Sequence, residues 1–296
     1  MATELVGILP LIVILGPTAS GKTALAVELA QKYNGEIICA DSRTIYREAN
    51  IGTAKPSVDD QARVPHWGLD LINPDETYSA AQFKQYAVNK IAEIRSRGHV
   101  PFLVGGTGLY IDAVVFDYQF GPKADANRRA ELTGMSIELL HEYCAKNSIL
   151  LPENAQNKRY VIRAIEQDGR ALLKREQPIS GSVIVGITTN KNNLRTRMAF
   201  RTEQLLEHGV VEEAKQLGEK YGRNAPALSG NIYRLAHAYL SGNQTLEEVK
   251  EKNTTLDWRL AKRQLTWFRR NKFIQWYSPT DAYSHVNDYL ASQSKS

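Results

Sequence analysis

The sequence predicts an α/β protein: a parallel-sheet core with a phosphate-binding loop (P-loop), a helical insertion domain and a helical C-terminal region. Three observations support this fold class. The first hundred residues alternate apolar runs with helical patterns. The glycine-rich stretch GPTASGKT joins the first apolar run to the first helix, and helical patterns dominate beyond Phe116. Alternating strands and helices are typical of a parallel sheet covered by helices on its faces.

The spacing of apolar residues defines the elements in order. Residues 11–15 (LIVIL), 36–40 (EIICA) and 99–104 (HVPFLV) are continuous apolar runs. Such runs indicate strands that are buried on both faces. Helical patterns separate them over residues 22–33 and 79–97, and each pattern ends near a glycine. The succession predicts strand, helix, strand, helix, strand.

The pattern changes in the second part of the chain. Residues 117–179 are polar and helical, which we interpret as an insertion. The β-branched run SVIVGIT, which ends at Thr188, predicts a strand that rejoins the sheet. Helical patterns then cover 192–277, and the polar tail from Ser278 is expected to be weakly ordered. The expected division is a catalytic core of residues 1–116 and 180–296 and an insertion domain of residues 117–179.

Composition limits the class of protein. The chain has 296 residues, of which 43% are hydrophobic and 23% charged, as in ordinary globular proteins. No stretch approaches the ~20 apolar residues of a membrane span, and MATELVGILP lacks a cationic leader. The two cysteines, Cys39 and Cys144, have no metal-type spacing. We therefore expect a cytoplasmic monomer with no membrane contact.

Positive charge gathers near the C-terminus. The net charge is +5, and seven basic residues lie between Glu251 and Trp276 against two acidic ones. They are Lys252, Arg259, Lys262, Arg263, Arg269, Arg270 and Lys272. A polyanionic partner and a solvated helix face both explain this density.

The clearest motif is the phosphate loop. Residues 16–23 match G-x-x-x-x-G-K-[ST] between a predicted strand and a predicted helix, as the motif requires. Its glycines let backbone N–H groups point at an anion, Lys22 supplies a point charge, and the Thr23 hydroxyl is a candidate Mg²⁺ ligand. The candidate diphosphate-binding residues are Gly16, Thr18, Ala19, Ser20, Gly21, Lys22 and Thr23.

Most such loops bind ATP or GTP, but a nucleotide hydrolase normally has a carboxylate after a later apolar strand. Here the third strand is followed by Gly-Gly-Thr-Gly, and the acidic candidate, Asp41, follows the second strand. Ligands of parallel sheets gather beyond the carboxyl ends of the strands, so the loop, Asp41 and Thr107 should converge there. A phosphate loop that faces a carboxylate suggests group transfer.

Five motifs together resemble the tRNA dimethylallyltransferase (tRNA isopentenyltransferase) family, over nearly the whole chain from Leu11 to Arg270. They are GPTASGKT, ADSRTIY, IGTAKP, GGTGLY and AKRQLTWFR, in this order. The resemblance implies transfer of a dimethylallyl group from dimethylallyl diphosphate to the exocyclic amine of the adenine next to the anticodon in tRNA. It implies that Asp41 is the base, with a strand-end cap or a Mg²⁺ ligand as alternatives. Lys22 and Thr107 complete the implied catalytic set.

The resemblance also implies contacts to diphosphate and RNA. Arg197 and Arg201 match a family arginine cluster for the diphosphate, although a solvated helix face explains them equally. Asp41, Ser42, Arg43 and Thr44 match the stretch that meets the target adenine. Arg159 and Arg163, four residues apart in the insertion, match a segment that contacts the anticodon arm. At 100° per residue, five residues of the last helix fall within about 100°, and we call them the basic stripe: Arg259, Lys262, Arg263, Thr266 and Arg270.

Four positions depart from the family pattern. Thr44 stands where Gln is usual, and Tyr160 where Arg is usual. Gly-Tyr-Lys-Glu becomes Ile-Tyr-Arg-Leu at residues 232–235, and Thr-Arg becomes Asp257-Trp258. All four concern RNA contacts more than diphosphate binding, so they bear on which tRNAs are recognised.

Three other functions are compatible with parts of the sequence. A P-loop kinase of a small metabolite or nucleoside would share the sheet and loop but needs an adenine pocket and a lid. An RNA-binding protein that uses a nucleotide as a switch would not need Asp41. A relative that prenylates free AMP would not need the basic C-terminal helix.

Overall fold

The computed structural model describes residues 9–121, 125–170 and 172–293. Within these ranges six strands form one sheet, in the order β3-β2-β4-β1-β5-β6, and every neighbouring pair is parallel. The strands are β1 Leu11–Leu15, β2 Gly35–Ala40, β3 His66–Trp67, β4 Val100–Gly105, β5 Ser182–Ile187 and β6 Gln275–Tyr277. The predicted α/β class with a parallel sheet is therefore confirmed.

The C-terminal part differs from the prediction. The helical pattern expected over 192–277 is interrupted by β6, a three-residue edge strand that pairs only with β5. The expectation of a weakly ordered tail from Ser278 is wrong, because Pro279–Gln293 forms helix α12. This helix is mostly polar, but Ala282, Val286 and Leu290 recur every four residues and are buried. Such spacing puts all three on one helical face.

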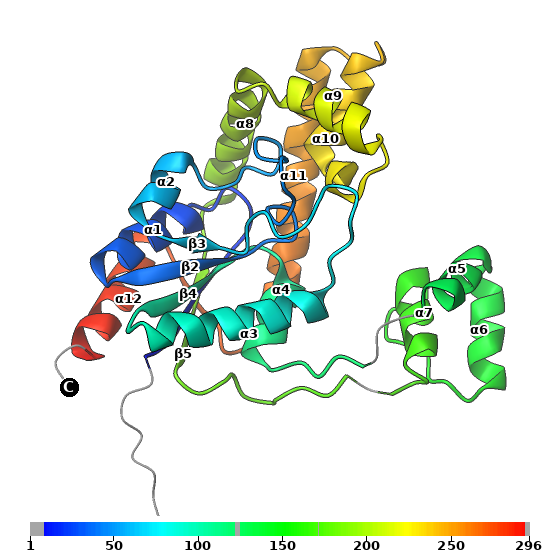
Figure 1. The fold of residues 1–296 in the computed structure, drawn as a ribbon, viewed down its shortest axis with the longest axis horizontal. Coiled ribbons are helices and arrows are strands. Elements are labelled where there is room, and N and C mark those ends of the chain that lie inside the picture. Colours follow the sequence, from blue (N-terminus) through cyan, green and yellow to red (C-terminus); the bar gives the residue numbers. More distant parts are fainter. Residues whose placement is uncertain (1–8, 122–124, 171, 294–296) are drawn as a thin grey trace, which may run out of the picture. The chain divides into compact units, whose positions relative to one another are not determined.

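Helices cover both faces of the sheet (Figure 1). On one face α1 (Lys22–Lys32) and α12 share an apolar cluster with β1, β2, β4 and β5. On the other face α3 (Ala80–Ser96) and α4 (Gly108–Val115) pack together, and the Phe83 and Tyr110 rings stack with centroids 4.2 Å apart. Burial on both faces explains why β1, β2 and β4 read as continuous apolar runs.

Four further helices form a bundle in the same part of the chain as the sheet (Figure 1). They are α8 Lys191–Glu207, α9 Val210–Tyr221, α10 Asn231–Leu240 and α11 Leu246–Phe268. A short 3₁₀ helix, Pro226–Ser229, precedes α10, and α2 (Val58–Arg63) follows the long segment after β2. The bundle's apolar cluster includes Ile45, Tyr46 and Ala49 from that segment. The packing therefore fixes the chain immediately after Asp41.

The described chain separates into two compact units. One comprises Met1–Val115 with Pro178–Ser296, and the other is Phe116–Gln177. The predicted domain boundaries lie within a few residues of these limits. The second unit contains α5 Ala126–Gly134, α6 Ile137–Lys146 and α7 Lys158–Glu166, around its own apolar cluster. No helix in the described ranges is long and apolar enough to cross a bilayer.

Candidate active site

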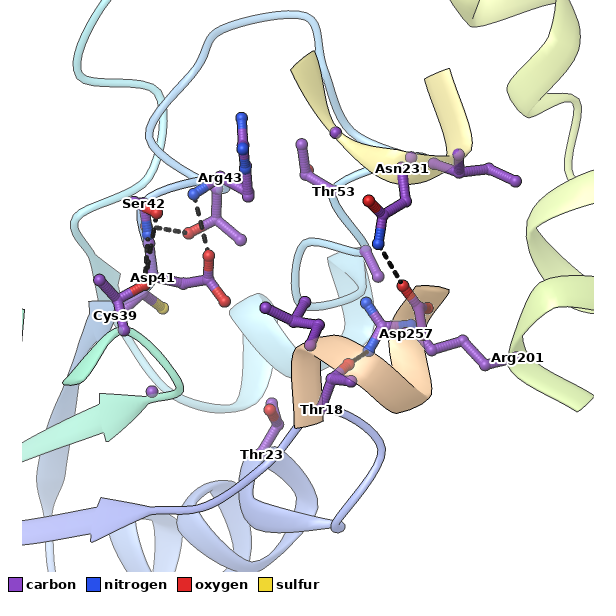
Figure 2. A pocket seen from close by; sticks show the side chains of 18 of the residues that line it. Thr18, Thr23, Cys39, Asp41, Ser42, Arg43, Thr53, Arg201, Asn231 and Asp257 are labelled. Atoms are coloured by element: carbon purple, nitrogen blue, oxygen red, sulfur yellow. Dashed lines mark hydrogen bonds between the residues drawn. The ribbon is translucent and has the colours of Figure 1, made fainter. Parts of the chain in front are cut away.

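Three loops meet at the carboxyl edge of the sheet. Strands β2, β4 and β1 are neighbours, so the residues that follow them lie side by side. They line a cavity of about 380 Å³, together with residues of α8, α10 and α11 (Figure 2). The sequence-predicted residues at this cavity are Thr18, Lys22, Thr23, Asp41, Ser42, Arg43, Thr44, Thr107, Arg201 and Arg263. The structure thus brings the predicted phosphate-loop residues and the predicted residues around Asp41 into one cavity.

The phosphate loop has the backbone geometry that an anion requires. Ala19 and Gly21 have positive φ angles, 61° and 92°, and α1 begins at the next residue, Lys22. In this conformation successive N–H groups point into the concave side of the loop, where the positive end of the helix dipole also lies. Ser20 is buried, and its hydroxyl has no hydrogen-bond partner within the described part of the chain. The loop therefore offers donors to a ligand.

Lys22 has an unusual protonation equilibrium. Its Nζ donates to the Pro17 carbonyl at 3.3 Å. Burial lowers the pKa of Lys22 to about 8; Asp41 opposes this shift and Arg201 adds to it. A neighbouring anion would raise the pKa again, so this lysine responds to ligand charge near neutral pH.

Both arginines predicted at the diphosphate reach the phosphate loop from α8. Arg201 Nη1 donates to Thr18 Oγ1 at 2.6 Å, and Arg197 Nη1 donates to the Ser20 carbonyl at 3.4 Å. The two arginines also line a second cavity of about 740 Å³ beside the loop. That cavity contains Ala19 and Gly21, which the first one lacks. Arg201 is half-buried, whereas Arg197 is exposed, so the solvated-face alternative still applies to Arg197.

Asp41 is held by its own loop. Its Oδ1 accepts from the Arg43 backbone N–H at 2.9 Å, and the Arg43 guanidinium donates to Ser229 Oγ at 2.7 Å. Thr107 Oγ1 accepts from the Ser42 backbone N–H at 3.0 Å, which ties the β4 loop to the β2 loop. Thr44 is buried, and its hydroxyl donates to the Asp41 carbonyl at 3.4 Å. One hydrogen bond, from the Arg43 backbone N–H, thus orients the carboxylate in the cavity, and the other bonds hold its loop (Figure 2).

Gln264 joins the phosphate loop to the β4 loop, and sequence analysis gave it no role. Its Oε1 accepts from the Thr18 backbone N–H at 2.9 Å, and its Nε2 donates to the Gly106 carbonyl at 3.0 Å. A Cβ at Gly106 would lie 2.5 Å from Gln264 Nε2, so a side chain there would displace the Gln264 amide from this position. The signal was the position of Gln264 inside AKRQLTWFR, one of the five family motifs, of which only the basic residues were given a role.

Glu213 on α9 anchors the segment around Gly52, and sequence analysis gave it no role either. Its carboxylate accepts from the backbone N–H groups of Asn50, Ile51 and Gly52 at 2.8–2.9 Å. The Tyr233 hydroxyl donates to the same carboxylate at 2.6 Å. Gly52 lines the cavity, so this carboxylate sets the position of the IGTAKP segment.

The predicted RNA-contact residues divide into two groups. On α11, Arg259, Lys262 and Arg263 are exposed, and Arg263 also lines the cavity. The stripe is shorter than predicted, because α11 ends at Phe268 and Arg270 lies in the turn beyond.

In the second unit Arg159 and Arg163 differ in environment. Arg159 is exposed, whereas Arg163 is half-buried and its Nη1 lies 3.2 Å from Glu166 Oε2. Glu166 also accepts two hydrogen bonds of 2.6 Å from Arg129. Arg163 is therefore part of an internal ion-pair network.

The departures from the family pattern fall in different environments. Ile232 and Leu235 are buried in the bundle core, and Tyr160 is 50% exposed. Trp258 lies beneath Arg195 and Lys262, whose charges are 5.6 and 5.5 Å from its ring centroid. Asp257 lines the cavity, where burial raises its pKa while Asn231, Arg201 and Asn253 lower it.

Two models of known protein families match the chain. The model described as IPP transferase matches residues 44–271, and the model described as isopentenyl transferase matches residues 9–65. The chain belongs to the IPP transferase family. Family membership makes it a prenyl transferase and does not favour the kinase alternative.

Individual members of the IPP transferase family match over nearly the whole chain. It is 38% identical to a tRNA dimethylallyltransferase of Bacillus mycoides over 91% of this chain and 90% of that protein. A relative of the same name from Bacillus licheniformis is 37% identical over 92% of this chain and 91% of its own length.

Solved structures of the family have the same fold. The full-length tRNA isopentenylpyrophosphate transferase of Bacillus halodurans is 35% identical, with a TM-score of 0.73, and 97% of this chain covers 98% of it. A eukaryotic dimethylallyltransferase, in a structure described as acting on tRNA, is 22% identical with a TM-score of 0.79. The match covers 95% of this chain and 79% of that one, and at this identity it supports the fold alone.

Proposed function

We propose that this chain transfers the dimethylallyl group of dimethylallyl diphosphate to the exocyclic amine of the adenine 3′-adjacent to the anticodon in tRNA, releasing diphosphate. One observation carries the proposal. A single cavity is lined by Thr18, Lys22 and Thr23 of the phosphate loop and by Asp41 and Thr107 of the neighbouring loops. An anion-binding loop and a carboxylate that share one cavity suit transfer between an anionic donor and an amine.

The donor half explains how the leaving group departs. The bond between the prenyl C1 carbon and the diphosphate oxygen breaks, and negative charge grows on the diphosphate. Loop N–H groups, Lys22 and Arg201 would stabilise that charge where it develops. The contact between Arg201 and Thr18 keeps the guanidinium at the loop.

The acceptor half needs a proton acceptor. The exocyclic amine is a poor nucleophile, because its lone pair is delocalised into the adenine ring. As its nitrogen bonds to the prenyl carbon, it loses one proton to the Asp41 carboxylate. The hydrogen bond from the Arg43 backbone N–H to Asp41 Oδ1 fixes the orientation of that carboxylate.

Mg²⁺ is the cofactor that we propose. The Thr23 hydroxyl lines the cavity, and the described residues hold no cluster of three His, Cys, Asp or Glu that could bind a metal. Mg²⁺ usually takes one or two protein ligands and completes its shell with phosphate oxygens and water, so this sparse set fits. The bound ion would supply positive charge to the leaving diphosphate.

The RNA half rests on the exposed cations. Arg259, Lys262 and Arg263 on α11 would contact the phosphates of the anticodon stem-loop, together with Arg159 of the insertion. We propose a monomer that acts in the cytoplasm, consistent with the two buried, unpaired cysteines.

The test offers labelled dimethylallyl diphosphate with Mg²⁺ and one of three acceptors: unmodified tRNA, AMP or none. We expect label on tRNA alone, at the adenine beside the anticodon. Asp41→Asn should bind donor and tRNA nearly normally but transfer about 10²–10⁴ times more slowly in a single turnover. Label on AMP, or ATP hydrolysis without transfer, would contradict the proposal.

A further inference from the structure

The cavity contains a second carboxylate besides Asp41. Asp257, on α11, lines the cavity with Asn231 and Asn253. Its Oδ1 accepts from Asn231 Nδ2 at 3.2 Å, and its Oδ2 accepts from Asn253 Nδ2 at 3.4 Å. Figure 2 shows Asp257 with Asn231 and Arg201 on one side of the view and Asp41 with Ser42 and Arg43 on the other.

Asn253 leaves an acceptor unused beside this carboxylate. Its side chain is 1% exposed, and its Nδ2 also donates to Thr202 Oγ1 at 2.9 Å. Its Oδ1 is buried and has no hydrogen-bond partner among the residues that the structure describes. A buried acceptor without a partner costs free energy, and native proteins usually satisfy it with a protein group, a water molecule or a ligand. Asp257 and Asn253 together therefore call for a ligand with a hydrogen-bond donor.

The ribose of the acceptor nucleotide supplies such a donor. A diphosphate carries acceptors and negative charge, which a carboxylate repels, and the prenyl chain has no polar atom. The proton that the exocyclic amine of the target adenine loses is assigned to Asp41, on the other side of the cavity in Figure 2. Within a polynucleotide the 3′ and 5′ oxygens of each ribose are esterified, so the 2′-hydroxyl is the O–H that remains.

We propose that Asp257 and Asn253 form a subsite that accepts a hydrogen bond from the ribose 2′-hydroxyl of the acceptor nucleotide. The inference rests on the proposed function. The subsite restricts the acceptor to RNA at the modified position.

The experiment uses three anticodon stem-loops that differ only in the target nucleotide: adenosine, 2′-deoxyadenosine and 2′-O-methyladenosine. A fourth stem-loop with one deoxynucleotide in the stem is the control. With the wild-type enzyme we expect kcat/KM to fall about 10–100-fold for both target modifications and to stay unchanged for the control. Equal rates on adenosine and deoxyadenosine would overturn the subsite whatever the variants do.

The Asp257→Asn variant separates the subsite from a general effect of sugar conformation. It should act more slowly on adenosine, and its ratio between adenosine and deoxyadenosine should fall several-fold, because a neutral amide oxygen accepts a weaker hydrogen bond than a carboxylate. The same 10–100-fold ratio in Asp257→Asn as in the wild type would overturn the inference. If the wild type fails to prenylate even the all-ribose stem-loop, the proposed function itself is wrong, so the two failures are distinguishable.

Discussion

At the scale of single residues, Lys22 links donor binding to pH. Its pKa in the free enzyme is lowered from 10.5 to about 8, mainly by burial. Diphosphate favours the charged lysine, so above pH 8 donor binding must take up a proton. We expect the Kd for dimethylallyl diphosphate to rise by up to about tenfold per pH unit above 8. Calorimetry between pH 7 and about 10 measures this.

Lys22→Ala is the control for this dependence. It should bind the donor more weakly at pH 7 and lose the rise above pH 8. An equally steep rise in Lys22→Ala would assign the proton to another group.

The lowered pKa of Lys22 also affects the stability of the fold. The unfolded chain keeps the Lys22 proton up to about pH 10.5, whereas the folded chain loses it near pH 8. The contribution of Lys22 to the free energy of unfolding therefore increases as the pH rises from 8 to 10.5.

Gln264 provides a second prediction at this scale. Gln264→Glu keeps the shape and the oxygen that accepts from Thr18, but it replaces the donor to Gly106 with a charged acceptor. Losing a part-buried hydrogen bond in this way should lower the single-turnover transfer rate by about 10–100-fold. Lys252→Gln, an exposed change on α11 outside the predicted RNA-contact residues, is the matched control for the change of charge. A wild-type rate in Gln264→Glu would show that the two loops need no bridge.

At the scale of elements, α11 contributes residues both to the catalytic cavity and to the exposed surface that we propose binds RNA. Gln264 and Asp257 face the cavity, while Arg259 and Lys262 are exposed. Each phosphate contact should contribute about 0.7–0.9 to the slope of log affinity against log salt. Arg263→Ala should therefore weaken tRNA binding and reduce that slope by about one. Lys215→Ala, an exposed change on α9, should leave the slope unchanged in filter-binding assays.

The same scale shows what the sequence could predict. Strands β1, β2 and β4 were predictable because burial on both faces makes them continuous apolar runs. Two short edge strands, β3 and β6, have two and three residues, too few to show a period. Helix α12 had a signal in its four-residue apolar spacing, but its polar composition outweighed it.

The candidate site divides in the same way. The phosphate loop and Asp41 were predictable because each depends on neighbours within a few residues, such as Gly21 or the Arg43 N–H. Gln264 and Glu213 depend on contacts across more than 150 residues, which a single sequence does not reveal. The sequence therefore predicts the local motifs, whereas the contacts that position them relative to one another are seen only in the structure.

At the scale of the whole molecule, RNA should be held by both compact units. Arg159 belongs to the second unit, is exposed and forms no ion pair among those found in the described ranges, whereas Arg163 is tied to Glu166. Arg159→Ala should weaken tRNA binding by about 0.2–1 kcal/mol or more without changing the melting temperature. Arg163→Ala should instead lower the melting temperature, because Glu166 loses one of its two arginine partners.

The combination of Arg159→Ala with Arg263→Ala tests whether both units hold one RNA. The two residues lie in separate compact units, so their effects on binding free energy should add if each contacts a different phosphate of the same tRNA. Filter binding of the wild type, both single variants and the double variant at one salt concentration gives the sum. Donor affinity, measured by calorimetry, should stay unchanged in Arg159→Ala, because Arg159 belongs to the unit without the cavity. If Arg159→Ala alters nothing and the double variant equals Arg263→Ala, RNA binding is confined to the unit that carries the catalytic cavity.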